Sequence, residues 1–222
     1  MFYNLILGRE KITINKKEER QEQILKAAFE AVADKGFNEV TLQSIADYAD
    51  VSKGVTNYYF KHKEEVFLSL LQWITHKIHE NEKRAIELES KALNQLESYV
   101  NAAFASPEKN RKFYKVYLEF LAQANNNKQF RNINLLFYEN CWKLGEEIVS
   151  NGIKEGVFPT DLNTRKEAIS IRAMIDGSLI QWLMRNDDSL HNFYRKNCFE
   201  TIRSFLTNES NESKSIFKIQ HS

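Results

Sequence analysis

The side chains with the clearest chemical potential lie between residues 52 and 63, where hydroxyl, amide and ammonium groups are closely spaced. Lys53, Thr56 and Asn57 offer a cation, a hydroxyl and an amide, and these groups hydrogen-bond to phosphates and base edges. Gly54 would let the backbone approach a ligand closely, and Tyr59 adds a phenol. The chemistry that this segment indicates is recognition of a nucleic acid.

Two short helices joined by a tight turn must position these groups. Leu42, Ile45, Ala46 and Ala49 recur at helical spacing, so they predict a first helix with one apolar stripe. Thr41 precedes this stripe and is a good N-cap. After the turn at Ala49-Asp50, a second helix is expected from its N-cap at Ser52 to Phe60, with Val51, Val55 and Phe60 facing inward.

The second helix would then present its polar side chains to a DNA major groove. We expect Thr56 and Asn57 to contact base edges, Lys53 and Lys63 to contact phosphates, and Tyr59 to position the backbone. The alternative is that these are ordinary solvated residues on a short helix. The complete set of predicted DNA contacts is Thr41, Ser52, Lys53, Gly54, Thr56, Asn57, Tyr59 and Lys63.

The same segment resembles the N-terminal signature of TetR-family transcriptional regulators over about residues 20 to 70. The matching residues are Gly36-Phe37, Thr41-Leu42, Ile45-Ala46, Ala49, Val51-Ser52-Lys53-Gly54, Tyr59-Phe60 and Lys63-Glu64. The resemblance implies a helical C-terminal ligand-binding and dimerisation domain, and residues 165 to 185 carry a weaker likeness to it. Asp50 stands where the family usually has Gly, and Thr56-Asn57 replaces a common Leu-Tyr pair.

Composition agrees with an all-α fold. The chain has 222 residues, 42% of them hydrophobic, with only seven Gly and two Pro, so long helices with few turns are expected. The formal net charge of +1 gives no global attraction for nucleic acid, so the prediction of DNA binding depends on local placement.

We expect about nine helices, and we divide the chain into four regions. Residues 1–19 would form a mobile N-terminal arm, 20–65 a three-helix helix-turn-helix domain, 66–206 a helical ligand-binding and dimerisation domain, and 207–222 a disordered tail. An apolar stripe from Val66 to Ile78 begins inside the DNA-binding domain and leaves it, which makes this helix a candidate lever.

Aromatic side chains in the C-terminal region could enclose an unknown small molecule. Such a set binds apolar or flat cationic compounds by burial and cation–π attraction, although aromatics at helical spacing are more often core residues. The predicted ligand-binding residues are Trp73, Phe104, Phe113, Tyr117, Phe120, Phe137, Tyr138 and Trp142.

The last two helices are both amphipathic, and a helix-turn-helix that needs a symmetric partner favours a four-helix homodimer interface. The alternative is that both helices complete the core of the protomer. The predicted interface residues are Ala173, Gly177, Ser178, Trp182, Tyr194, Cys198 and Ile202.

Other chemistry is not indicated. Cys141 and Cys198 fit no metal or redox spacing, so reduced thiols in a cytoplasmic protein are expected. His76-x-x-His79 with Glu80 lies on a face that looks solvated, and we predict no metal and no cofactor. Phe2–Leu7 is too short to span a membrane.

The sequence therefore predicts a ligand-released repressor that binds a palindromic double-stranded DNA operator as a dimer. Two alternatives stay open. One is a DNA-binding protein controlled by a protein partner instead of a small molecule. The other is a helical adaptor or enzyme in which the helix-turn-helix is only a packing motif; we find no enzyme motif in the sequence.

Overall fold

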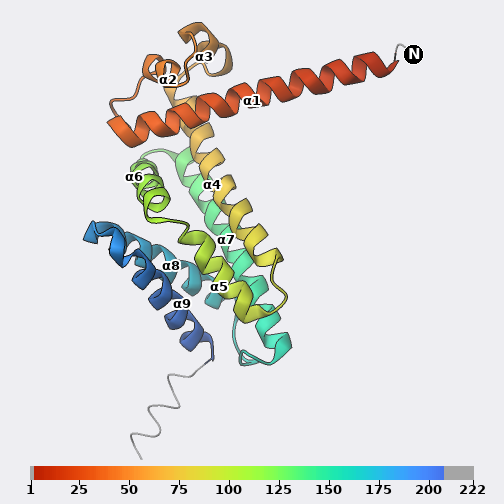
Figure 1. Ribbon diagram of the computed structural model, residues 1–222, viewed down its shortest axis with the longest axis vertical. Helices are drawn as coiled ribbons and strands as arrows, with labels where there is room; N and C mark the ends of the chain where they lie inside the picture. Colours follow the sequence, from red (N-terminus) through yellow and green to blue (C-terminus); the bar gives the residue numbers. More distant parts are fainter. Residues whose placement is uncertain (1–2, 208–222) are drawn as a thin grey trace, which may run out of the picture. The chain divides into compact units, whose positions relative to one another are not determined.

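The computed structural model describes residues 3–207, and within them all regular structure is helical (Figure 1). Nine α-helices and one short 3₁₀ helix follow each other in this described range, which confirms the expected all-α fold. They are α1 (Tyr3–Lys35), α2 (Leu42–Tyr48), α3 (Lys53–Tyr59), α4 (Lys63–Glu87), α5 (Ala92–Ala103), α6 (Pro107–Gln123), α7 (Lys128–Glu155), α8 (Thr164–Arg185), η1 (Asp188–Leu190) and α9 (His191–Thr207).

The chain divides into two compact units. The N-terminal unit comprises residues 1–74 and 115–133, and the C-terminal unit comprises residues 75–114 and 134–222. The N-terminal unit is therefore larger than the expected helix-turn-helix domain, because the end of α6 and the start of α7 pack onto it. An aromatic cluster joins these segments, with Phe67 and Phe120 centroids 5.8 Å apart and Phe120 and Phe130 centroids 5.6 Å apart.

Helix α1 differs from the expectation at its beginning. It starts at Tyr3, whereas we expected an arm up to residue 19 and a helix only from about residue 20. Its second half buries Ile24, Ala28 and Val32 in the core of the N-terminal unit. The helix ends at Lys35, and Gly36 after it has a φ of 83°, the left-handed conformation that glycine adopts at helix C-termini. Most of the predicted tail, residues 208–222, lies outside the described residues.

The turn between α2 and α3 forms as the sequence predicts. Thr41 and Ser44 make a capping box, in which each side chain accepts a hydrogen bond from the other residue's backbone amide. Asp50 has a φ of 51°, so it adopts the left-handed backbone that Gly more often supplies. Phe60 ends α3 and is buried.

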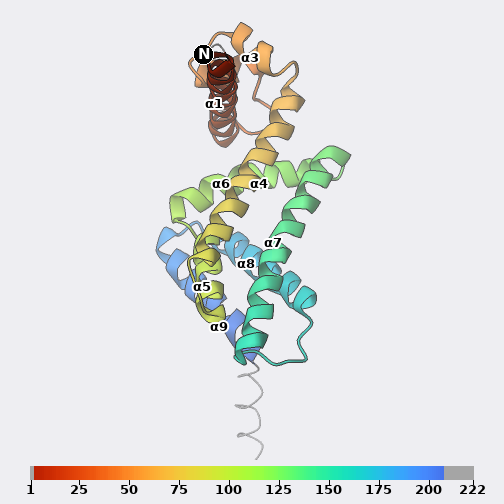
Figure 2. The same cartoon turned by 90° about the vertical axis from the view of Figure 1, so that its right-hand side faces the viewer.

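In the C-terminal unit, α9 packs against both α8 and α5 (Figures 1 and 2). The core between these helices includes Trp182 of α8 together with His191, Cys198 and Ile202 of α9. Both cysteines of the chain are buried free thiols, as expected. Burial raises the pKa of Cys141 well above its ordinary value and that of Cys198 to about 11.

Candidate functional site

Helix α3 presents a polar face to solvent. Lys53, Gly54 and Asn57 are exposed, and the side chain of Tyr58 is 69% exposed. The hydroxyl of Ser52 accepts a hydrogen bond from the amide of Val55, so the helix is fixed at its N-terminus. A short helix anchored in this way and polar on its outer side has the dimensions and the donor groups to enter a DNA major groove.

The prediction that Thr56 contacts base edges is wrong. Thr56 is fully buried, and its hydroxyl has no hydrogen-bond partner within the described residues. The reason is helical periodicity, because Thr56 lies one turn before the buried Phe60 and shares its inward face. Tyr58 was missed, although its position one turn after the exposed Gly54 would have identified it.

The other predicted contacts include two helix caps and a half-buried aromatic residue. The hydroxyl of Thr41 accepts from the Ser44 amide, 3.1 Å away, and both Thr41 and Ser52 are exposed caps. Tyr59 is half-buried, with its ring edge-on to that of Tyr58 at 5.0 Å.

Lys63 is held by the fold of its own unit. Its ammonium donates to the backbone oxygen of Asn38, 3.0 Å away, and lies over the rings of Phe37 and Phe67. Burial lowers the pKa of this lysine, with a smaller opposing effect from Glu39. Lys63 therefore fastens the start of α4 to the segment between α1 and α2.

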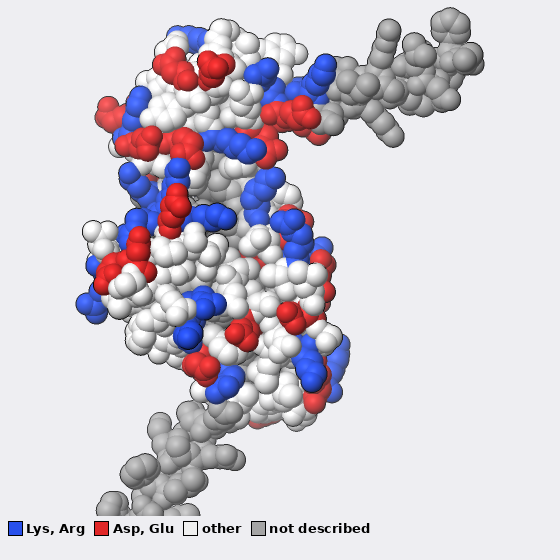
Figure 3. Space-filling view, viewed as in Figure 1, with Lys and Arg blue, Asp and Glu red and all other residues white. Residues whose placement is uncertain are grey.

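The surface charge is mixed. Lysine and arginine alternate with aspartate and glutamate over the face shown in Figure 3. This agrees with the net charge of +1.

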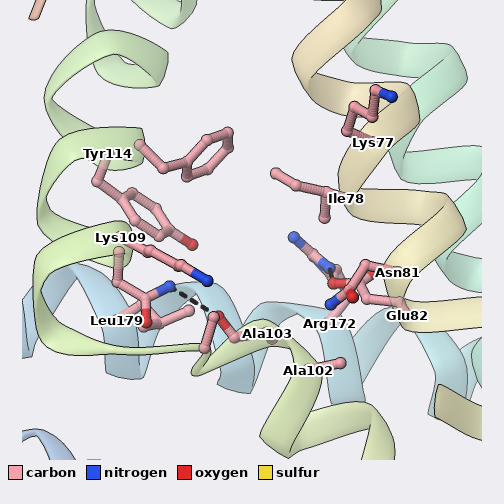
Figure 4. A pocket seen from close by; sticks show the side chains of 13 residues that line it. Lys77, Ile78, Asn81, Glu82, Ala102, Ala103, Lys109, Tyr114, Arg172 and Leu179 are labelled. Carbon is pink, nitrogen blue, oxygen red and sulfur yellow. Dashed lines mark hydrogen bonds and ion pairs between the residues drawn. The ribbon is translucent and has the colours of Figure 1, made fainter.

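The C-terminal unit contains a cavity of about 290 Å³ between α4, α5, α6 and α8 (Figure 4). Tyr114 lies on one wall and Ile78 on the opposite wall, while Arg172 and Glu82 lie close together on the α8 and α4 side. The lining is mainly apolar, with alanines of α5, Phe113 and Leu179, but it also carries Lys77 and Lys109.

A buried ionic network borders this cavity. The Arg172 guanidinium donates to Oε1 of Glu82 at 2.9 Å and to the carboxylate of Asp176, whose oxygens lie 3.0 and 3.2 Å from its nitrogens. Glu82 also accepts from the thiol of Cys141, and the Tyr114 hydroxyl donates to Asp176 at 3.4 Å. Burial raises the pKa of Glu82, and the neighbouring Arg172 opposes that rise.

The aromatic residues predicted to bind a ligand do not share one cavity. Phe113 lines the cavity, and the Phe137 ring lies 5.0 Å from the Arg172 guanidinium. Phe104 is a core residue against His191, whereas Tyr138 stacks on Trp142, which lies beneath Arg165. The remaining three, Trp73, Tyr117 and Phe120, belong to the N-terminal unit.

Sequence reasoning missed the charged residues of the cavity. Glu82 continues the apolar stripe of α4, four residues after Ile78, and a carboxylate on a buried stripe is a signal that could have been used. Arg172 follows Ile171 inside the apolar run of α8 and carries the same signal.

Three predicted dimer contacts are wrong. Trp182, Cys198 and Ile202 are buried within the protomer, and Nε1 of Trp182 donates to the backbone oxygen of Asp187. They serve the packing of α8 against α9. The other four predicted residues are more accessible: Ala173 is exposed, and Gly177, Ser178 and Tyr194 are half-buried.

The described residues offer neither a metal site nor a membrane-spanning helix. They contain no group of three histidine, cysteine, aspartate or glutamate side chains arranged to hold a metal ion. None of their helices combines the length and apolar character that crossing a bilayer requires.

Comparison with known proteins decides the family. Residues 24–70 match the model for bacterial regulatory proteins of the tetR family, and residues 92–207 match that for the C-terminal region of BetI-type transcriptional repressors. The chain belongs to the TetR family. It is a DNA-binding transcriptional regulator with a helix-turn-helix at its N-terminus and a C-terminal domain of the ligand-binding kind.

Among its relatives is the regulator TtgR of Pseudomonas putida, 28% identical over 182 residues that cover 77% of this chain and 85% of TtgR. The fatty acid metabolism regulator of Bacillus subtilis is 26% identical and covers 78% of this chain and 88% of its own length. A transcriptional regulator from Saccharomonospora viridis, solved with choline, shares the fold with a TM-score of 0.75 at 22% identity, covering 83% of this chain and 96% of that one.

Proposed function

We propose that this TetR-family protein is a homodimeric repressor that binds a palindromic operator and leaves it when a small molecule occupies the C-terminal cavity. The observation that carries the DNA-binding part is the solvent-facing polar surface of α3. Lys53, Asn57 and Tyr58 are exposed on this helix. In the proposed complex Lys53 would contact a phosphate, and Asn57 and Tyr58 would contact base edges or the adjacent backbone.

Exposed apolar side chains support pairing of two protomers through α8 and α9. Ile180 and Met184 lie on the outer surface of α8, and Phe193 and Phe205 lie on that of α9. Gly177 is in the middle of α8, and a Cβ added to it would meet no atom of the protomer within 4 Å. Since nothing within the protomer requires a residue without a side chain at this position, the glycine is consistent with close approach by a second copy.

Pairing would place two α3 helices about 34–36 Å apart, the spacing of successive major grooves on one side of DNA. A ligand releases DNA only if it binds the DNA-incompetent conformation more tightly than the competent one. The cavity bordered by α4 is a suitable place for such a ligand, because α4 begins directly after the helix-turn-helix.

Operator binding can be tested with the DNA fragment that precedes this protein's own gene. We expect a salt-sensitive complex containing two protomers, measured by fluorescence anisotropy and analytical ultracentrifugation. Asn57→Ala should lower the preference for this fragment over random DNA, whereas Lys53→Ala should weaken binding to both and reduce the salt dependence by about one phosphate contact. A monomeric protein with no affinity for any duplex would contradict the proposal.

A further inference from the structure

The side chains that line the cavity of the C-terminal unit include more cations than carboxylates. Lys77, Lys109 and Arg172 line it, against the single carboxylate of Glu82. Lys109 is exposed, and its ammonium takes part in none of the salt bridges within the described part of the chain. Figure 4 shows Lys109 extending from α6 toward the side of the cavity on which Arg172 lies. An ammonium with no anionic neighbour favours an anionic ligand group.

Arg172 is the second cation available to such a group. It is buried, and its planar guanidinium is fixed by Asp176 on one side and by Glu82 on the other. Asp176 lies on the same helix and holds the guanidinium from two nitrogens, whereas Glu82 comes from α4 and makes one hydrogen bond to it. Glu82 is therefore the partner that a ligand can replace without moving Arg172.

We propose that the cavity binds a small monocarboxylate with an apolar body, whose carboxylate takes the place of Glu82 beside Arg172 and is also paired with Lys109. This inference rests on the proposed ligand-binding function and adds the class of ligand to it. Ile78, Phe113 and Leu179 supply the apolar surface for the rest of the molecule. The volume of about 290 Å³ lies just below the usual range of ligand sites, roughly 300–1,000 Å³, so the ligand is small.

Charge balance determines what happens to Glu82. Its surroundings are Arg172 and Asp176 from α8, the Cys141 thiol from α7, and the phenols of Tyr99 from α5 and Tyr114 from α6. Without Arg172 it would be a buried carboxylate with only a thiol to stabilise its charge, and such a group takes up a proton. Ligand binding is then accompanied by uptake of one proton, and the net charge of the network stays constant.

The same exchange would loosen the connection between two helices. The Glu82–Arg172 ion pair joins α4 to α8, and both of its side chains are almost completely inaccessible to solvent. Replacing Glu82 by a diffusible carboxylate breaks that connection while leaving Arg172 neutralised. The monocarboxylate would therefore act on the helix that leads from the helix-turn-helix.

The test uses three probes of equal chain length: octanoate, 1-octanol and octylammonium. Binding to the full-length protein is measured by titration calorimetry without DNA, so the result does not depend on operator binding. We expect octanoate to bind at least about tenfold more tightly than octanol, because a desolvated charge pair has an effect of that order or larger, and octylammonium to bind most weakly. Tighter binding of octylammonium, or no binding of octanoate, would overturn the proposal.

Two variants separate the roles of the cations and of Glu82. Lys109→Gln should reduce octanoate affinity about two- to fivefold, as expected for one exposed ion pair, and leave octanol affinity unchanged. Glu82→Gln should increase octanoate affinity and abolish the proton uptake, measured as the dependence of binding heat on the ionisation enthalpy of the buffer. Unchanged octanoate affinity in both variants would contradict the assigned contacts.

Failure of the monocarboxylate proposal can be told apart from failure of the proposed repressor function. Octanoate binding with no effect on an operator complex would leave the site intact and refute ligand-released repression. Operator binding that responds to octylammonium or octanol but not to octanoate would support ligand control and refute the monocarboxylate.

Discussion

The ammonium of Lys63 lies 3.0 Å from the backbone oxygen of Asn38 and fastens the first turn of α4 to the segment that precedes α2. The same ammonium lies 5.6 Å from the ring centroid of Phe37 and 5.2 Å from that of Phe67. These contacts join two parts of the N-terminal unit, α4 and the segment between α1 and α2, through one side chain.

Lys63→Met should therefore lower the stability of the protein by about 1 kcal/mol, since it removes a hydrogen bond and a cation–π contact but keeps the aliphatic stem. Urea unfolding followed by circular dichroism measures this change. Lys53→Met is the matched control: Lys53 is exposed in α3, so its loss should weaken DNA binding without changing the unfolding midpoint. Equal stability of the two variants would contradict the role given to Lys63.

Thr56→Val should stabilise the protein by about 1 kcal/mol. Valine has nearly the same shape as threonine and removes a buried hydroxyl that has no hydrogen-bond partner among the described residues. A thermal unfolding experiment measures the gain, and Thr56→Val should still bind operator DNA. Loss of operator preference in a stably folded Thr56→Val variant would restore the base-contact hypothesis for this residue.

Two glycines should respond oppositely to alanine. A Cβ on Gly152 would lie 2.0 Å from the ring of Phe158, so Gly152→Ala should destabilise the protein by about 1–3 kcal/mol. A Cβ on Gly177 meets nothing within 4 Å, so Gly177→Ala should strengthen helix α8 by about 1 kcal/mol in a single protomer.

Gly177→Ala also tests the proposed dimer. If α8 packs closely against its copy, this variant should shift sedimentation toward monomer even though the protomer is more stable. An unchanged dimer with raised stability would show that Gly177 lies outside the interface.

The C-terminal unit should lose stability when the pH falls below about 6.5, the ordinary pKa of histidine. Burial lowers the pKa of His191, with a further decrease from Arg195, so the folded protein binds fewer protons at this residue than the unfolded chain does. Stability from His191 is thus present above pH 6.5 and declines as the pH falls through and below that value. Burial lowers the pKa of His79 as well, and this residue adds a contribution of the same sign.

Urea unfolding at pH 7.5, 6.5 and 5.5 measures this decline. His191→Gln should make it shallower, because glutamine can still hydrogen-bond to Asn110 but does not titrate. His79→Gln is the corresponding variant for the second histidine. If the free energy of unfolding falls with pH as steeply in His191→Gln as in the unaltered protein, His191 does not contribute to the decline.

The sequence was sufficient for the all-α fold and for the turn between α2 and α3, because these have local signals, but not for the start of α1. The Thr41 cap and the turn at Ala49-Asp50 were inferred from residue type and position, and the structure shows both. The inward position of Thr56 needed only a stricter use of periodicity. Residues such as Trp182 were harder, since an apolar side chain on a two-sided helix gives no indication of whether it faces its own chain or another.

The cavity was beyond sequence reasoning for a different reason. Glu82 and Arg172 are 90 positions apart, and their ion pair exists only because α4 and α8 pack together. The aromatic residues were predicted to bind a ligand one by one from their type, whereas most of them lie in the core or at the surface in separate places. Which apolar residues enclose a space depends on the packing of helices, which the pattern along any single helix does not contain.

The two buried thiols have a practical consequence. Cys141 and Cys198 are both almost fully shielded from solvent and have raised pKa values, so neither supplies a thiolate near neutral pH. A cysteine introduced at an exposed position, such as Asn197→Cys on α9, should be the preferred target of maleimide reagents in the folded protein. Distance measurements between spin or fluorescent labels can therefore proceed without first removing the native cysteines.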